Sequence, residues 1–194
     1  ASDSSIIFDG NAQDFHIGLD DSADSLTIGL GSTLGTTSHM VVDATGAVTK
    51  PLQPAFQVGL SSSQDTFATS TDVTVLFANE IFDNNSDFNT SNYTFTAPVT
   101  GRYQLNVSLR LNHVDNGAAF YQMYFISSNR TYTFTTDSDA YINSDLAYQS
   151  FAWSVLADMD ASDTVYVRIY QSGGTQQTDV AASAHSIFSG FLVC

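Results

Sequence analysis

The chain has 194 residues, with 20 acidic against 5 basic side chains and a formal net charge of −15 at pH 7. This charge would repel the phosphate backbone of DNA or RNA and an anionic membrane surface, so it argues against both partners. Hydrophobic residues make up 43% of the chain, enough for a real core, and the one cysteine, Cys194, excludes an internal disulfide framework. No apolar stretch approaches membrane-spanning length.

Residues 1–50 consist of short, similar units. The segment FHIGLDDS at 15–22 aligns with LTIGLGST at 26–33, an offset of eleven, and shorter copies begin at Ile6 and His39. Each unit predicts a strand of about four residues followed by a Gly/Asp/Ser turn. One such unit cannot bury its apolar side alone, so the repetition predicts stacking on neighbours. We expect a short-strand β-repeat stem built by several chains; a β-meander subdomain of a monomer is the alternative.

Two prolines, Pro51 and Pro54, then interrupt the pattern, and residues 51–54 are predicted to be an extended linker. From residue 55 to 194 the expected strands are longer and no helical periodicity occurs. This predicts an all-β sandwich, with a jelly roll preferred because the loops are long. The expected strands are 55–60, 73–79, 93–97, 102–112, 118–127, 130–135, 147–156, 164–171 and 186–193.

Two of these strands are apolar on both faces, namely 118–127 and 186–193. The outer face of a two-sheet sandwich is normally wet, so the second apolar face indicates contact with another subunit. We therefore predict a subunit interface at Phe120, Tyr124, Phe188 and Leu192.

The strand 102–112 alternates apolar and polar residues without error and follows a Pro-Gly turn. This region, with Phe77, Asn79, Phe82, Phe95, Pro98, Gly101 and Tyr103, resembles the motif spacing of the C1q-like domain. Near the end, Asp163-x-Val165 and the run SIFSGFL at 186–192 resemble the closing strands of that family. The resemblance covers about residues 55–194. It implies a ten-stranded C1q/TNF-like jelly roll that assembles into compact homotrimers and serves recognition rather than catalysis.

The N-terminal part departs from animal members of that family, because it lacks the Gly-X-Y period of a collagen stem. It resembles the shaft-to-tip junction of bacteriophage tail or head fibres. The chain also lacks an initiator Met, and we expect the rest of a fibre N-terminal to residue 1. The resemblance implies the distal end of a trimeric fibre on the extracellular virion surface.

Residues suited to catalysis are not arranged in a recognisable pattern. The four histidines form no zinc motif, and there is no G-x-S-x-G nucleophile elbow. Polysaccharide hydrolysis would need two facing carboxylates in a sugar cleft, which the aspartate count alone does not establish. Turn aspartates could bind Ca²⁺, and Asp137 with Asp139 is the candidate pair; solvated turn residues are the alternative. We expect no enzyme and no obligatory cofactor.

Aromatic residues among polar loop residues suggest a recognition surface. Tyrosine offers rigid, amphipathic contact area that suits sugars or protein surfaces, although core or interface packing explains it equally well. The leading hypothesis is a head that attaches a phage fibre to a bacterial surface glycan or protein; a folding and trimerisation cap and a secreted C1q-like glycan-recognition protein are the alternatives. The predicted receptor-binding residues are Arg130, Tyr132, Tyr141 and Asn143.

Overall fold

A computed structural model describes residues 2–137 and 143–194 of the chain. The chain divides into two compact units, Ala1–Gln53 and Pro54–Cys194, which we call the stem unit and the head unit. Within the described residues, no helix has the length and apolar character needed to cross a membrane.

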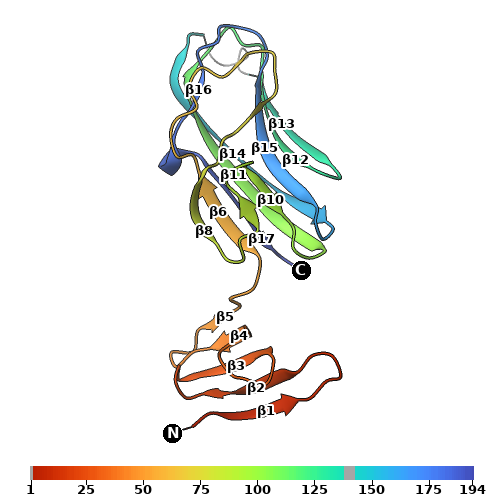
Figure 1. The fold of residues 1–194 in the computed structure, drawn as a ribbon. Helices are drawn as coiled ribbons and strands as arrows, with labels where there is room; N and C mark the ends of the chain where they lie inside the picture. The colour runs from red at the N-terminus through yellow and green to blue at the C-terminus, as the bar shows by residue number, and fades with distance from the viewer. Residues whose placement is uncertain (1, 138–142) are drawn as a thin grey trace. The chain divides into compact units, whose positions relative to one another are not determined.

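The stem unit contains a five-stranded antiparallel sheet in chain order (Figure 1). The two aligned repeats form the neighbouring strands β2 and β3, with Ile17 opposite Ile28 and Leu19 opposite Leu26. The offset of eleven residues is therefore one strand plus its turn. The strands are β1 (Ser4–Phe8), β2 (Phe15–Asp20), β3 (Ser25–Leu30), β4 (Ser38–Val42) and β5 (Val48–Thr49).

The head unit is an all-β jelly-roll sandwich, which confirms the fold class expected from the sequence. Sheet I has the order β13-β12-β15-β10-β9, with β7 also paired to β15; sheet II has the order β14-β11-β17-β6-β8, with β16 also paired to β11 (Figure 1). The described residues of the head unit form twelve strands rather than the expected ten, and three of the twelve are only two residues long. Sheet I contains β7 (Val73–Thr74), β9 (Phe88–Asn89), β10 (Thr94–Thr96), β12 (Tyr121–Ser127), β13 (Thr131–Thr136) and β15 (Thr164–Gln171). Sheet II contains β6 (Ala55–Gly59), β8 (Asn79–Asp83), β11 (Gly101–Val114), β14 (Leu146–Met159), β16 (Asp179–Val180) and β17 (Ile187–Leu192).

Strand β11 supplies one wall of the core, as its alternation predicts. Its inward side chains from Tyr103 to Leu111 are buried, and the polar side chains between them face outward. Beside them on the neighbouring strand β17, Phe188 contacts four other rings, with centroids 5.0 to 6.1 Å apart. Burial of these rings contributes to the apolar contact that holds the sheets together, with the aliphatic residues of the same core. The four neighbours are Phe56, Phe77, Phe88 and Phe125.

The subunit interface predicted at Phe188 is wrong. Phe188 is fully buried in the core of the head unit, and Leu192, on the same face of β17, packs against that core. The outward side chains of β17 are Ile187, Ser189 and Phe191 instead, because Phe188, Gly190 and Leu192 alternate with them on the face that packs against the core. The two faces of the strand were therefore exchanged in the prediction.

The predicted interface residues on β12 lie differently. Tyr124 is half-buried on the outer face of the strand, and Phe120, just before it, stacks on Tyr170 with ring centroids 6.1 Å apart. Their role in an interface stays a prediction.

The two ends of the sandwich are distinguished by the first and last residues of the head unit, which lie together at one of them. The Leu192 N–H donates to the Pro54 carbonyl (3.0 Å) and the Arg102 N–H donates to the Cys194 carbonyl (2.8 Å), so the first residue of the head unit and the C-terminus share one end (Figure 1). We call it the entry end. Strand β11 runs from there over 14 residues to the apical end, roughly 40 Å away at about 3.3 Å per residue.

Candidate functional site at the apical end

The apical end of the head unit contains an open cavity of about 740 Å³. Its lining comes from four segments that are far apart in the sequence: the loop after β6, the end of β11, the start of β14, and the stretch leading into β16. The lining residues are Asp65, Thr66, His113, Asp145, Leu146, Ala147, Gln176, Gln177 and Asp179.

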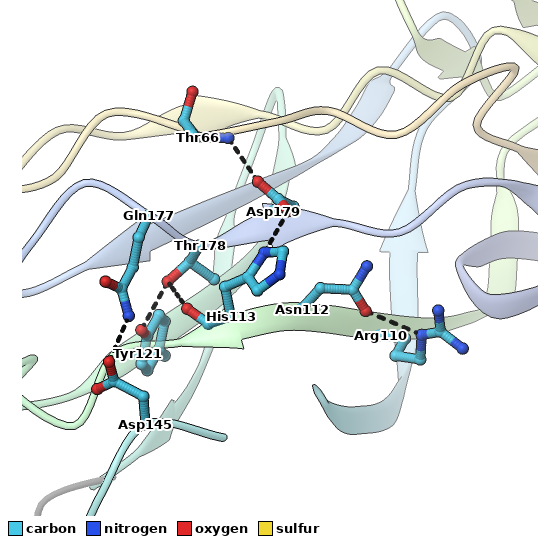
Figure 2. Close-up of polar contacts among 9 residues, drawn as sticks. All are labelled: Thr66, Arg110, Asn112, His113, Tyr121, Asp145, Gln177, Thr178 and Asp179. Atoms are coloured by element: carbon cyan, nitrogen blue, oxygen red, sulfur yellow. Dashed lines mark hydrogen bonds and ion pairs between the residues drawn. The ribbon is translucent and has the colours of Figure 1, made fainter. Parts of the chain in front are cut away.

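His113 occupies the end of β11 in an unusual backbone conformation. Its φ is 52°, in the left-handed region that residues other than glycine seldom adopt. The His113 Nδ1 atom lies 2.8 Å from Asp179 Oδ2, and the Thr66 N–H donates to Asp179 Oδ1 at 2.7 Å (Figure 2). Asp179 is buried whereas the imidazole is exposed. The carboxylate therefore holds the imidazole in the cavity wall, and a residue with this backbone conformation in a cavity wall supports the hypothesis of a functional site.

Asp145 fastens the opposite side of the cavity. Its carboxylate accepts a hydrogen bond from Gln177 Nε2 at 2.9 Å (Figure 2). It also accepts one from the Asn116 N–H at 3.0 Å. The Asn116 N–H and, after it, the Gln177 side chain hold the pKa of Asp145 below its usual range. The carboxylate is therefore ionised in neutral water, and it joins the start of β14 to two other loops.

Buried hydrogen bonds support the cavity from behind. The Tyr121 hydroxyl lies 2.9 Å from Thr178 Oγ1 (Figure 2). It also accepts a hydrogen bond from the Asp115 N–H at 3.0 Å. Burial raises the pKa of this phenol, which stays neutral. The Asp115 carboxylate in turn accepts the N–H groups of Gly117 (2.8 Å) and Thr175. Because each loop is tied to another, the wall is organised before any ligand binds.

The chemistry of the cavity is that of a binding site. Carboxylate and amide oxygens accept hydrogen bonds, amide nitrogens donate them, and Leu146 with Ala147 adds a small apolar area. Among the residues that the structure describes, no three His, Cys, Asp or Glu side chains are grouped as a metal site. Asp137 is exposed directly after β13, and its predicted calcium partner Asp139 lies outside the described residues. The calcium site stays a prediction.

The predicted receptor-binding residues do not form one cluster. Arg130 is exposed in the turn between β12 and β13. Its carbonyl accepts a hydrogen bond from the Ser127 N–H, and Ser127 pairs with Val165 at the start of β15, which places the turn near the entry end. Tyr132 packs against the core. Asn143 is exposed two residues before Asp145, next to the cavity, and Tyr141 lies outside the described residues.

The cavity itself was missed from the sequence because its walls are joined by contacts between distant residues. His113 and Asp179 are 66 positions apart, and Thr66 and Asp179 are 113 apart. Two local signals existed. The alternation of β11 breaks at His113, and a polar run follows β15, namely Gln176-Gln177-Thr178-Asp179.

Comparison with known proteins gives a consistent result for the head unit. Residues 55–193 match the family described as C1q domain. The globular domain of zebrafish complement 1qA protein has a similar structure, with a TM-score of 0.53 and 19% identity over 73% of this chain and 98% of that one. Murine APRIL is similar with a TM-score of 0.51 and 11% identity over 73% and 99% of the two chains. No curated protein matches the sequence.

Proposed function

The chain belongs to the C1q domain family through residues 55–193, and on that premise we propose that it is a trimeric, extracellular receptor-binding head that recognises a bacterial surface glycan through the apical cavity. Domains of the C1q/TNF type are typically extracellular, non-catalytic binding domains that form trimers. The observation that carries the proposal is the position of the cavity. It lies at the end of the head unit away from the chain entry, where a receptor can approach.

A homotrimer is supported by the outer face of sheet II. Leu156 and Phe191 are 54% and 46% exposed there, and Tyr148 on the same strand as Leu156 is 67% exposed. Large apolar side chains gathered on one sheet face indicate an interface. This face, rather than the buried Phe188, is the one that packs against neighbouring copies in the proposal.

The charges of the cavity favour a glycan that is rich in hydroxyl groups and carries no negative charge. Asp65, Asp145 and Asp179 would repel phosphate, sulfate or carboxylate groups, and they can accept hydrogen bonds from sugar hydroxyls. Three identical sites on one trimer would raise the avidity for a repetitive surface polymer well above the affinity of one site.

The proposed location, the tip of a bacteriophage fibre, is supported by the stem unit. Its sequence resembles the shaft-to-tip junction of phage fibres, it consists of short antiparallel strands, and it precedes the head unit in the chain. A head that serves only as a folding cap for such a fibre would need no recognition site. The organised apical cavity favours recognition over the cap.

The proposal is tested by measuring binding of the fluorescently labelled full chain to a panel of bacterial cells and to neutral capsular polysaccharides purified from them. Asp65 is exposed in the cavity, so Asp65→Arg changes its charge without disturbing the core. We expect this variant to lose at least tenfold in binding. Asp160→Arg is the matched control, since Asp160 is an exposed turn residue near the entry end, and it should bind as the wild type does.

Equal loss in both variants would mean that net charge and not the cavity controls binding. A wild-type chain that binds none of the cells, including a strain that the parent virus infects, would favour the cap.

A further inference from the structure

The two faces of the stem sheet are buried in the opposite sense to that of an ordinary protein. One face of β2 and β3 carries small and polar residues, and these are the buried ones: His16 and Thr27 are 1% and 2% exposed, and Ser25 and Asp20 are 4% and 7% exposed. The other face carries the aliphatic and aromatic side chains, of which Phe15, Leu19, Leu26 and Ile28 are exposed and Ile17 and Leu30 are half-buried. In a water-soluble monomer the apolar face would be the covered one.

The chain itself covers the polar face. The segment between β3 and β4 folds back over it. Its close approach is shown by the space around two glycines: a Cβ placed on Gly35 would lie 2.6 Å from the Asp20 carboxylate, and one placed on Gly29 would overlap the Thr37 carbonyl. Hydrogen bonds fix this arrangement: the Leu30 N–H donates to the Thr37 carbonyl at 2.9 Å, and His16 Nδ1 lies 2.9 Å from the Gly31 carbonyl.

The strand register assembles the apolar face into continuous rows. Ile6, Ile17, Ile28 and Met40 are opposite one another across four strands, flanked by the row Leu19, Leu26, Val42 and Val48 and by the row Phe8, Phe15 and Leu30. None of these positions is charged. Seven of them are large side chains with exposed fractions between 38% and 61%: Ile6, Phe8, Phe15, Leu19, Leu26, Ile28 and Val48.

We propose that this face of the stem unit packs against the same face of other copies of this chain, so that the stem is an assembly interface separate from the head. Half-exposed side chains at seven positions amount to roughly 600 Å² of apolar surface per copy, against about 800 Å² per partner in a standard interface. An interface of that order is sufficient for self-association. The contact does not depend on the receptor or on the cavity.

The absence of charge on the apolar rows permits another copy as the partner. With a net charge of −15, two copies repel each other wherever their acidic surfaces meet. The apolar rows are a surface on which two copies can meet without placing like charges against each other. If the heads form the proposed trimer, they also raise the effective concentration of the stems, and a modest intrinsic affinity is then enough.

The test uses the full chain with Cys194→Ser as background and one new thiol. Ile28→Cys places it at the centre of the apolar face, on the middle strand of the sheet. Ile7→Cys is the matched control, since Ile7 lies on the opposite face of β1 and both side chains are 38% exposed. We expect mild oxidation, or a bis-maleimide with a longer reach, to cross-link most Ile28→Cys chains into covalent dimers and few Ile7→Cys chains.

Absence of cross-linking with both reagents at position 28, or equal cross-linking at both positions, would overturn the inference. A thiol at position 28 that resists maleimide without joining copies would indicate a foreign partner and would also overturn it. Light scattering on the same samples distinguishes failure of the stem interface from failure of the proposed function. If the chains are trimers but lack the cross-link, the stem inference fails and the proposal for the head remains.

Discussion

At the scale of single residues, substitution of two adjacent glycines at the apical end distinguishes the cost of backbone strain from the cost of steric crowding. Gly173 and Gly174 have nearly the same left-handed φ, 72° and 73°. A Cβ on Gly173 would meet nothing within 4 Å, whereas one on Gly174 would overlap the Asp115 carboxylate. We predict that Gly173→Ala costs about 1–2 kcal/mol of unfolding free energy and that Gly174→Ala costs about 1–3 kcal/mol more. Urea unfolding measures both, and equal losses would contradict the structure.

Asp163 provides a residue-scale prediction about pH. Its carboxylate accepts hydrogen bonds from Ser128 Oγ (2.5 Å), Asn129 Nδ2 (2.8 Å) and the Asp160 N–H (2.8 Å). The Ser128 hydroxyl first, and then the Asp160 N–H, hold the pKa of Asp163 below 3.8. Between that lower pKa and 3.8 the unfolded chain binds more protons, so the stabilisation is present above pH 3.8 and is lost as pH falls through the folded pKa.

We therefore expect the urea midpoint of the wild type to fall as the pH is lowered below about 4, and to fall less steeply in Asp163→Asn. Asp160→Asn, a neighbour whose carboxylate is outside this set of hydrogen bonds, should keep the wild-type slope. Identical slopes in all three proteins would show that Asp163 does not contribute to the acid sensitivity.

At the scale of elements, β17 carries one structural face and one candidate interface face. Phe188 is fully buried among four rings, so Phe188→Ala should cost about 3–5 kcal/mol. Phe191 is 46% exposed, and Phe191→Asp should leave the monomer fold intact and shift the assembly toward smaller species. Thermal unfolding and light scattering on both variants check the assignment. If Phe191→Asp leaves the assembly unchanged, sheet II is not the interface.

The elements show how far the sequence predicts this fold and where it stops. Strict alternation predicted β11 to within two residues, because one of its faces packs on the core and the other faces outward. The face of β17 was misassigned, because apolar residues lie on both sides of that strand and only the surrounding sheets distinguish them. Residues 73–79 read as one strand, yet only Val73–Thr74 pair with β15, and β8 begins at Asn79. The cavity depends on contacts between distant loops, which local patterns do not encode.

At the scale of the whole molecule, the stem unit and the head unit each expose apolar side chains on one sheet face. The open cavity, in contrast, is lined by polar side chains, among them Asp145 and Asp179, whose carboxylates accept hydrogen bonds from neighbouring loops of the head unit. In the proposals made above, assembly and recognition use different surfaces, so the apical loops could vary without loss of the oligomer. Loops on a rigid scaffold commonly carry recognition in this way.

The stoichiometry of the full chain is the last prediction. We expect light scattering behind a sizing column to give three times the 20.9 kDa of one chain, and the same mass in EDTA. The reason is that the exposed faces of both units are apolar, and burial of apolar surface requires no ion. High salt should not dissociate the trimer either, since salt screens repulsion between the acidic copies. A monomer under all conditions would contradict both proposed interfaces, and a trimer that dissociates only in EDTA would place a bridging cation at the acidic turns.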